Sequence, residues 1–159
     1  MLIPLYDGQE AVVDEIDADL AEFVWFANGN GYAIRGGDHE PRLQRMHRII
    51  MERMIGRPLG RHEFPDHINN QRLDNRRSNL RLATNAQNAF NRGRNTNNST
   101  GYKGVYRNPG SSKNPWMARI MVNRRSHYLG SYVTAEAAAR AYDAMAVKIA
   151  GQFAKTNGV

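Results

Sequence analysis

The run from residue 64 to residue 88 constrains the fold more than any other part of the chain. A short apolar segment at residues 64–68 surrounds Asp66 and His67, and residues 69–79 are rich in turn formers without periodicity. Residues 80–83 then alternate apolar and polar, as a return strand does. Thr84 opens a Thr-x-x-Gln capping box, which predicts a helix that begins just after it. The run therefore predicts a strand, a loop, a second strand and a helix, within an α+β fold.

Four polar residues of this run suit the hydrolysis of a phosphodiester bond. That reaction needs an activated water, charge neutralisation at phosphorus and help for the departing 3′ oxygen. His67 can take a proton from water, and oxygen atoms of Asp66 and Asn88 can hold Mg²⁺ or Mn²⁺. Asn79 can tie down the loop backbone and so fix the His67 rotamer. Alternation along a strand puts Asp66 and His67 on opposite faces, so the strand has to twist or end there.

Charge is distributed unevenly along the chain. The net charge is +7, yet residues 1–40 contain nine acidic residues and one basic residue. Residues 41–159 contain six acidic and twenty-one basic residues. This asymmetry predicts a body that binds nucleic acid, preceded by an acidic N-terminal piece. The alternative is a generally basic surface with no such partner.

Residues 1–40 predict a small α/β lead-in. After a short strand, residues 14–22 indicate a polar turn and a short helix with Asp17 or Asp19 near its N-cap. Residues 23–34 contain two aromatic, β-branched runs separated by Asn-Gly-Asn-Gly, which is typical of a hairpin. The acidic residues of this lead-in are interpreted as a solvated face.

Two further segments complete the N-terminal part of the chain. Residues 43–55 place apolar side chains at helical spacing, and His47 within them is interpreted as a packing or capping residue. Residues 93–100 are polar, small and basic, which predicts a linker. A flexible coil of about this length would span roughly 17 Å.

The C-terminal part predicts a three-stranded antiparallel sheet with one helix behind it. Residues 102–107, 116–122 and 127–132 are strand-like runs separated by turn formers. An alanine-rich helix follows at residues 134–149, with Thr134 as its N-cap and Gly151 as its C-cap. The many small residues indicate close packing of the helix against the sheet.

Residues 43–92 resemble the HNH nuclease family, whose ββα-metal (His-Me finger) motif has the same order of elements. The similarity rests on Asp66-His67-Ile68-Asn69, on the run from Leu73 to Thr84, and on Gln87-Asn88 with Asn91-Arg92. Position by position, the resemblance implies His67 as general base, Asn79 as the catalytic residue that positions the loop, and Asp66 and Asn88 as metal ligands. Asn at position 88, where one common form has His, is similar to homing-type members.

Residues 99–157 resemble the ethylene-response-factor (Apetala-type) DNA-binding domain. The similarity rests on Tyr102-Lys103-Gly104-Val105, on the run from Trp116 to Ile120 and on the helix from Thr134 to Asp143. In that family the sheet lies in the major groove. The resemblance implies that eight side chains face DNA: Lys103, Tyr106, Arg107, Trp116, Arg119, Arg124, Arg125 and Tyr128. Ordinary sheet packing is the alternative for Trp116 and Tyr128.

Three of these eight positions depart from the plant domains. Lys103 replaces their usual Arg, Arg119 their Glu, and Tyr128 their Trp. The target sequence of the plant domains therefore does not carry over to this chain.

Four segments follow from these patterns. They are a lead-in (residues 1–40), a ββα-metal nuclease domain (41–92), a linker (93–100) and a DNA-binding domain (101–157). Together they predict a divalent-metal-dependent endonuclease, encoded by a phage or mobile element, that acts on double-stranded DNA as a monomer or weak dimer. The alternatives are a non-catalytic transcription regulator and an RNA-directed nuclease.

The remaining composition narrows the class of protein further. There is no cysteine, which excludes disulfides and thiolate zinc ligands. We expect no signal peptide, because the N-terminus lacks a basic region followed by a long apolar run. We also expect no membrane association, since no window approaches eighteen apolar residues. A phage or mobile-element origin would place the protein in the cytoplasm of the host cell.

Overall fold

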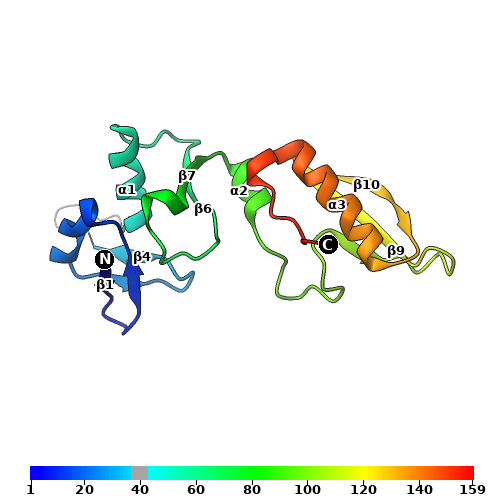
Figure 1. Ribbon diagram of the computed structural model, residues 1–159, viewed down its shortest axis with the longest axis horizontal. Helices are drawn as coiled ribbons and strands as arrows, with labels where there is room; N and C mark the ends of the chain where they lie inside the picture. The colour runs from blue at the N-terminus through cyan, green and yellow to red at the C-terminus, as the bar shows by residue number, and fades with distance from the viewer. Residues whose placement is uncertain (37–42) are drawn as a thin grey trace. The chain divides into compact units, whose positions relative to one another are not determined.

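The computed structural model describes residues 1–36 and 43–159, and the chain divides into two compact units (Figure 1). The first unit is Met1–Asn85 and the second is Ala86–Val159. These units group the four predicted segments differently, because the lead-in and the hairpin around His67 belong to one unit. The predicted boundary between residues 40 and 41 lies outside the described residues.

The first unit contains three small antiparallel sheets within its described residues, in the orders β1-β2, β3-β4-β5 and β6-β7. Their strands are β1 (Leu2–Pro4), β2 (Glu10–Val12), β3 (Phe26–Ala27), β4 (Ala33–Arg35), β5 (Gln44–Arg45), β6 (Phe64–His67) and β7 (Leu80–Ala83). Its helical elements are the 3-10 helix η1 (Glu15–Glu22), the α-helix α1 (Met46–Ile55) and the 3-10 helix η2 (Arg77–Asn79). The predicted hairpins at residues 23–34 and 64–83 are therefore confirmed as elements.

Helix α1 begins three residues later than the apolar spacing suggests. Gln44 and Arg45 pair with β4 instead, and Arg35 Nε donates a hydrogen bond of 2.8 Å to Gln44 Oε1 across that pair. The helix ends at Gly56, whose φ of 70° is a left-handed conformation that glycine adopts without a Cβ penalty.

One hydrophobic core joins the lead-in to the rest of the first unit. Trp25 is fully buried, and its indole Nε1 donates a 2.7 Å hydrogen bond to Leu20 O. The buried residues around it come from both sides of residue 40: Ile3, Leu5, Ala11, Val13, Leu20, Ala33, Met46, Ile50, Met51, Leu59 and Leu80. The lead-in is thus part of the body that carries His67.

The expectation of a solvated acidic face is wrong for Asp17, which is 0% exposed. Its carboxylate pairs with Arg77 Nε at 2.8 Å and with Arg53 Nη1 at 3.0 Å. Neither Asp17 nor Asp19 caps η1, because the N-cap position is Asp14. The Asp14 side chain accepts instead from the backbone N–H of Arg77, at 2.7 Å. These long-range pairs fix η1 against α1 and η2, which local sequence signals did not reveal.

The second unit is one antiparallel sheet, in the order β10-β9-β8, covered on one face by a helix (Figure 1). Its elements are β8 (Val105–Arg107), β9 (Trp116–Val122), β10 (Arg125–Tyr132), α3 (Ala135–Ala150) and the 3-10 helix η3 (Gly151–Phe153). The short helix α2 (Asn85–Asn91) starts just after Thr84, as the capping box predicts, and lies across the boundary between the units. Thr134 Oγ1 accepts from Ala137 N at 3.1 Å, which confirms the predicted cap of α3.

Small residues allow α3 to approach the sheet closely. Ala138 and Ala139 are fully buried against Val105 and Ala118. Gly104 has a φ of 75°, and a Cβ there would lie 2.0 Å from the Tyr142 ring. The residue before β8 therefore has to be glycine.

The predicted linker makes local hydrogen bonds within the second unit. Arg94 Nη1 donates to Gly101 O at 2.6 Å, and Asn98 Nδ2 donates to Tyr102 O at 2.9 Å. Within residues 1–36 and 43–159, no helix is both long and apolar enough to span a membrane.

Candidate functional site

His67 is the last residue of β6 and is only 4% exposed, as is its neighbour Asp66. In the β6-β7 hairpin, Asp66 lies opposite Arg81 and His67 lies opposite Leu80. Arg81 Nε donates a 2.8 Å hydrogen bond to Asp66 Oδ2. The carboxylate therefore has a fixed direction, set by its cross-strand partner.

Two rings pack against His67. The His47 ring, from α1, stands perpendicular to it with centroids 5.1 Å apart, and the Tyr32 ring lies at 5.9 Å. Burial lowers the pKa of His47 to about 3, so this ring is neutral at pH 7. Burial also lowers the pKa of His67, although its hydrogen bond to Asn75 Oδ1 and the charge of Asp66 oppose the shift. Both imidazoles are thus neutral bases near pH 7, and the packing role predicted for His47 agrees with these contacts.

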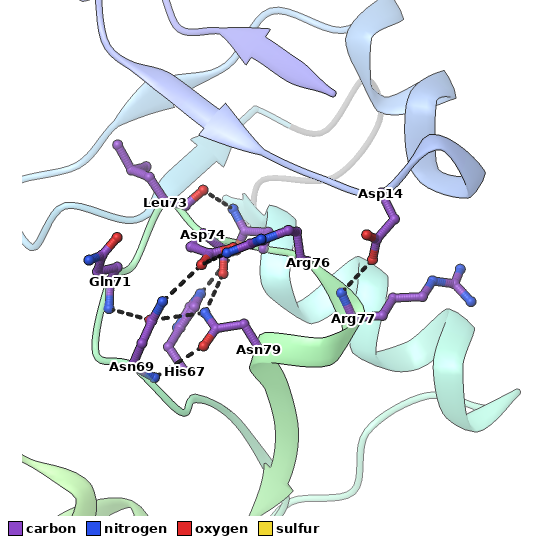
Figure 2. Close-up of polar contacts among 10 residues, drawn as sticks. Asp14, His67, Asn69, Gln71, Leu73, Asp74, Arg76, Arg77 and Asn79 are labelled. Atoms are coloured by element: carbon purple, nitrogen blue, oxygen red, sulfur yellow. Dashed lines mark hydrogen bonds and ion pairs between the residues drawn. The ribbon is translucent and has the colours of Figure 1, made fainter.

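Asn79 connects the two ends of the loop that follows His67 (Figure 2). Its Oδ1 accepts from Asn69 N at 3.1 Å, and its Nδ2 donates to Asn69 Oδ1 at 3.0 Å and to Asp74 O at 2.7 Å. Its backbone carbonyl accepts from Ile68 N at 2.9 Å. Asn79 therefore holds both the start and the middle of the loop.

Asp74 is a buried carboxylate of this loop that sequence reasoning missed. Arg76 binds it with two nitrogens, Nε at 2.8 Å and Nη2 at 2.7 Å, and Asn69 Nδ2 donates to it at 2.8 Å (Figure 2). The hydrogen bond from Arg76 holds the pKa of Asp74 below its usual range. The Asp-x-Arg spacing of residues 74–76 is the one local signal that could have indicated this pair.

Asn75 is the second residue that sequence reasoning missed. It is 1% exposed, and its Oδ1 lies 3.0 Å from His67 Nε2. Seven residues of irregular loop (68–74) lie between the two, so no periodic pattern could have indicated this contact.

Strand β2 of the lead-in supports the same loop. Val12 N donates to Leu73 O and Asn75 N donates to Val12 O, both at 2.8 Å. The lead-in thus reaches the residues next to His67 through backbone hydrogen bonds.

Asn88 lies in α2, beyond the boundary between the units. Its convergence with Asp66 on one ion therefore remains a prediction. Among residues 1–36 and 43–159, no group of three or more His, Cys, Asp or Glu side chains could hold a metal. The predicted pair, one carboxylate and one amide oxygen, has the donor chemistry that Mg²⁺ accepts when water and substrate supply the other ligands.

The eight side chains predicted to bind DNA lie in different environments. Alternation along β9 puts Ala118 and Ile120 on the face covered by α3, and Arg119 on the other face. Arg119 of β9 lies directly opposite Tyr128 of β10, and both side chains are exposed. Tyr106 is exposed on β8 and lies on the same face of the sheet as Arg119. These three side chains form what we call the open face.

The other five are placed differently. Trp116 has the parity of Ala118 and packs against the core beneath α3, with the Arg107 guanidinium 4.2 Å from its ring centroid. This placement agrees with the alternative interpretation of Trp116, in which its side chain packs in the sheet core and does not face DNA. Arg125 lies opposite Val122, on the same face of the sheet as Ala118 and not on the open face. Arg124 lies in the exposed turn before it, with a φ of 64°.

Lys103 is half-buried, and its ammonium donates to Phe90 O and Arg92 O at 2.7 Å each. Burial lowers the pKa of Lys103 to about 8. Lys103 therefore binds backbone carbonyls at the C-terminal end of α2.

Comparison with known proteins assigns the family. The model of the HNH endonuclease family matches residues 44–90, which contain the hairpin and the loop described above. A protein of Acanthamoeba polyphaga mimivirus named as an uncharacterized HNH endonuclease is 31% identical over 140 residues, covering 88% of this chain and 70% of the viral protein. The chain belongs to the HNH endonuclease family and is an endonuclease. HNH nucleases generally use a divalent metal ion and act on DNA.

A second similarity concerns the C-terminal part alone. An ethylene-responsive transcription factor of Arabidopsis thaliana is 46% identical over 61 residues, covering 37% of this chain and 23% of the plant protein. No solved structure matches the chain significantly.

Proposed function

We propose that this chain is a divalent-metal-dependent endonuclease that nicks or cuts double-stranded DNA at sites selected partly by its C-terminal sheet. The observation that carries the proposal is the buried imidazole of His67, which lies next to a carboxylate at the end of a strand. The same order of strand, loop, strand and helix supports a ββα-metal fold for this region.

In this mechanism His67 is the general base. It takes a proton from water, whose oxygen attacks phosphorus as the bond to the 3′ oxygen breaks. Asn79 holds the loop in place, since its amide bridges Asn69 and the Asp74 carbonyl. Asp66 and Asn88 would hold Mg²⁺ or Mn²⁺, and the bound ion would supply positive charge to neutralise the phosphoryl oxygens and the departing 3′ oxygen. A carboxylate has about four lone-pair sites, so Asp66 can keep its Arg81 hydrogen bond and still bind an ion.

The C-terminal unit supplies DNA affinity. The similarity to a plant transcription factor supports a sheet domain of the ethylene-response-factor type, which would lie in the major groove. Tyr106, Arg119 and Tyr128 of the open face, with Arg124 at its turn, are the side chains best placed to contact DNA. A linked reader raises the local concentration of the nuclease at its sites without new contacts at the active centre.

The mimivirus relative supports a viral or mobile-element origin, as for homing-type members. The enzyme would then act in the cytoplasm of the host cell.

Cleavage of a supercoiled plasmid with Mg²⁺ or Mn²⁺ tests the proposal. We expect His67→Ala to reduce kcat by about 10²–10⁴-fold, the usual contribution of a general base. The matched control is Gln71→Ala, which removes an exposed side chain from the same loop while its backbone N–H still bonds Asn69. Equal plasmid cleavage by wild type and His67→Ala would contradict the assigned role.

The competing function is a transcription regulator that binds DNA without cutting it. The similarity to a plant transcription factor favours this reading for the second unit alone. If wild type binds DNA tightly yet leaves it intact with either metal, the regulator is the correct reading.

A further inference from the structure

The side-chain amide of Asn75 is held in one orientation. Its Nδ2 lies 3.3 Å from Leu73 O and 3.4 Å from Met46 Sδ. Both are acceptors, so the NH₂ group faces them and the carbonyl Oδ1 faces His67 Nε2 at 3.0 Å. Because Asn75 is 1% exposed, solvent cannot supply alternative partners.

This orientation determines where the neutral His67 ring carries its proton. An amide oxygen can only accept, so the hydrogen bond needs a proton on Nε2. The neutral ring then has its lone pair on Nδ1. We propose that Asn75 is a positioning residue that holds His67 in the Nε2–H tautomer, so that Nδ1 takes the proton from the attacking water. The proposal rests on the general-base role assigned to His67 above.

The same hydrogen bond serves the charged form of the ring. When Nδ1 takes the water proton, Nε2 keeps its own proton and continues to donate to Asn75 Oδ1. The attacking oxygen bonds to phosphorus as the bond to the 3′ oxygen breaks, and no further reactant is needed. Asn75 therefore orients the base before the proton transfer and stabilises it afterwards.

Strand β2 of the lead-in fixes Asn75 from the other side. Val12 O accepts from Asn75 N, and Val12 N donates to Leu73 O, each at 2.8 Å. Leu73 O is also the acceptor that orients the Asn75 amide. Strand β2 is thus a part of the site, because its backbone holds both the asparagine and the carbonyl that aims it.

Nuclear magnetic resonance of the ¹⁵N-labelled full-length protein reads the tautomer directly. Long-range ¹H–¹⁵N correlations distinguish a protonated from an unprotonated ring nitrogen, and His67→Gln identifies the His67 signals by their loss. In wild type near pH 7.5 we expect a proton on Nε2 and none on Nδ1. A wild-type ring protonated on Nδ1 overturns the proposal without any Asn75 variant, so it does not depend on a variant that folds.

Two variants test the role of Asn75 in catalysis. Asn75→Ala removes the acceptor, and we expect mixed tautomers and a kcat lower by about 10–100-fold with KM little changed, the usual cost of losing an outer hydrogen-bond partner. Asn75→Asp keeps an acceptor oxygen in a side chain of the same shape, so we expect the Nε2–H tautomer to return. Gln71→Ala should leave both the tautomer and kcat unchanged.

The outcomes separate this proposal from the proposed function. If Asn75→Ala keeps the Nε2–H tautomer and the wild-type kcat, the positioning role is overturned while the nuclease assignment stands. If wild type shows the expected tautomer but leaves DNA intact with Mg²⁺ and Mn²⁺, the proposed function fails, and the catalytic role of Asn75 fails with it.

Discussion

The two units use polar side chains in opposite ways. In the first unit Asp17, His67, Asn75 and Asn79 are buried, and each contacts a partner of complementary polarity. In the second unit the buried side chains, apart from Asn91, are mostly alanine, with Val105, Ile120, Tyr142 and Phe153, while the open face exposes Tyr106, Arg119 and Tyr128. Among the described residues, no buried side-chain nitrogen or oxygen lacks a hydrogen-bond partner.

This difference has a physical consequence for each unit. A satisfied polar network in a low-dielectric interior is rigid, and removing one member leaves the others unpaired. An exposed binding face has no such coupling, so its residues can change with little effect on folding. The first unit should therefore lose stability where it is polar, and the second only where it is small and apolar. Four tests follow, three substitutions and one pH dependence, from the largest expected effect on the free energy of unfolding to the smallest.

Gly104→Ala should destabilise the second unit by more than about 4 kcal/mol, since the new Cβ would lie 2.0 Å from the Tyr142 ring and 2.8 Å from Arg119 O. Thermal unfolding followed by near-ultraviolet circular dichroism measures the loss. Gly110→Ala is the control, because a Cβ there meets only Asn108 Oδ1 at 3.8 Å. If the two variants unfold alike, the close approach of α3 to the sheet is not what stabilises this unit.

Asp17→Asn should destabilise the first unit by about 3–5 kcal/mol, because it leaves Arg53 and Arg77 without their shared buried carboxylate. Urea unfolding measures the change. Asp19→Asn is a matched control: Asp19 also pairs with Arg53, but its side chain is 49% exposed, and exposed pairs contribute about 1 kcal/mol or less. Similar losses in both variants would mean that burial of Asp17 does not matter.

The stability of the first unit should fall as the pH drops below about 6.5. Burial lowers the pKa of His47 to about 3, so the folded ring stays neutral where the unfolded chain binds a proton. The contribution is fully present above about pH 6.5 and is lost at up to about 1.4 kcal/mol per pH unit as the pH falls towards 3. Burial lowers the pKa of His67 as well, and that shift acts in the same direction.

Urea unfolding at pH 7 and pH 5 measures this slope. His47→Gln should make it shallower, because one of the two buried titrating rings is removed. His62→Gln, which removes an exposed histidine from the same unit, should leave it unchanged. A wild-type stability that is constant from pH 7 to pH 5 would contradict the burial of these rings.

Arg119→Ala should change the free energy of unfolding by less than about 0.5 kcal/mol. It should nevertheless weaken DNA binding and reduce the slope of log K against log salt by about one, as expected for the loss of one phosphate contact. Lys148→Ala removes the same charge from the exposed side of α3 and serves as the control. Equal losses of affinity would show that overall charge, and not the open face, binds DNA.

Local patterns predicted much of the fold. The hairpin of β6 and β7, the start of α2 after Thr84 and the cap of α3 at Thr134 all depend on residues within a few positions of one another. Apolar spacing also predicted α1, but not its first residue, because pairing of Gln44 and Arg45 with β4 involves a strand nine residues earlier.

The candidate site was only partly predictable, for the same reason. Asp66, His67 and Asn79 have residue types and spacing that indicate their chemistry. Asn75 gave no such signal. Its contact with His67 depends on the path of an irregular loop and on Val12 of strand β2, which precedes Asn75 by more than sixty residues.

The sequence by itself determined the order of the elements, the residue types at the site and the basic C-terminal body, since these follow from local periodicity, capping and charge. Only the tertiary structure decided that Asp17 is buried, that Trp116 packs inward and that Lys103 clamps α2. It also decided that strand β2 supports Asn75, the residue that contacts His67. The partners in these contacts lie far apart along the chain, and only packing brings them together.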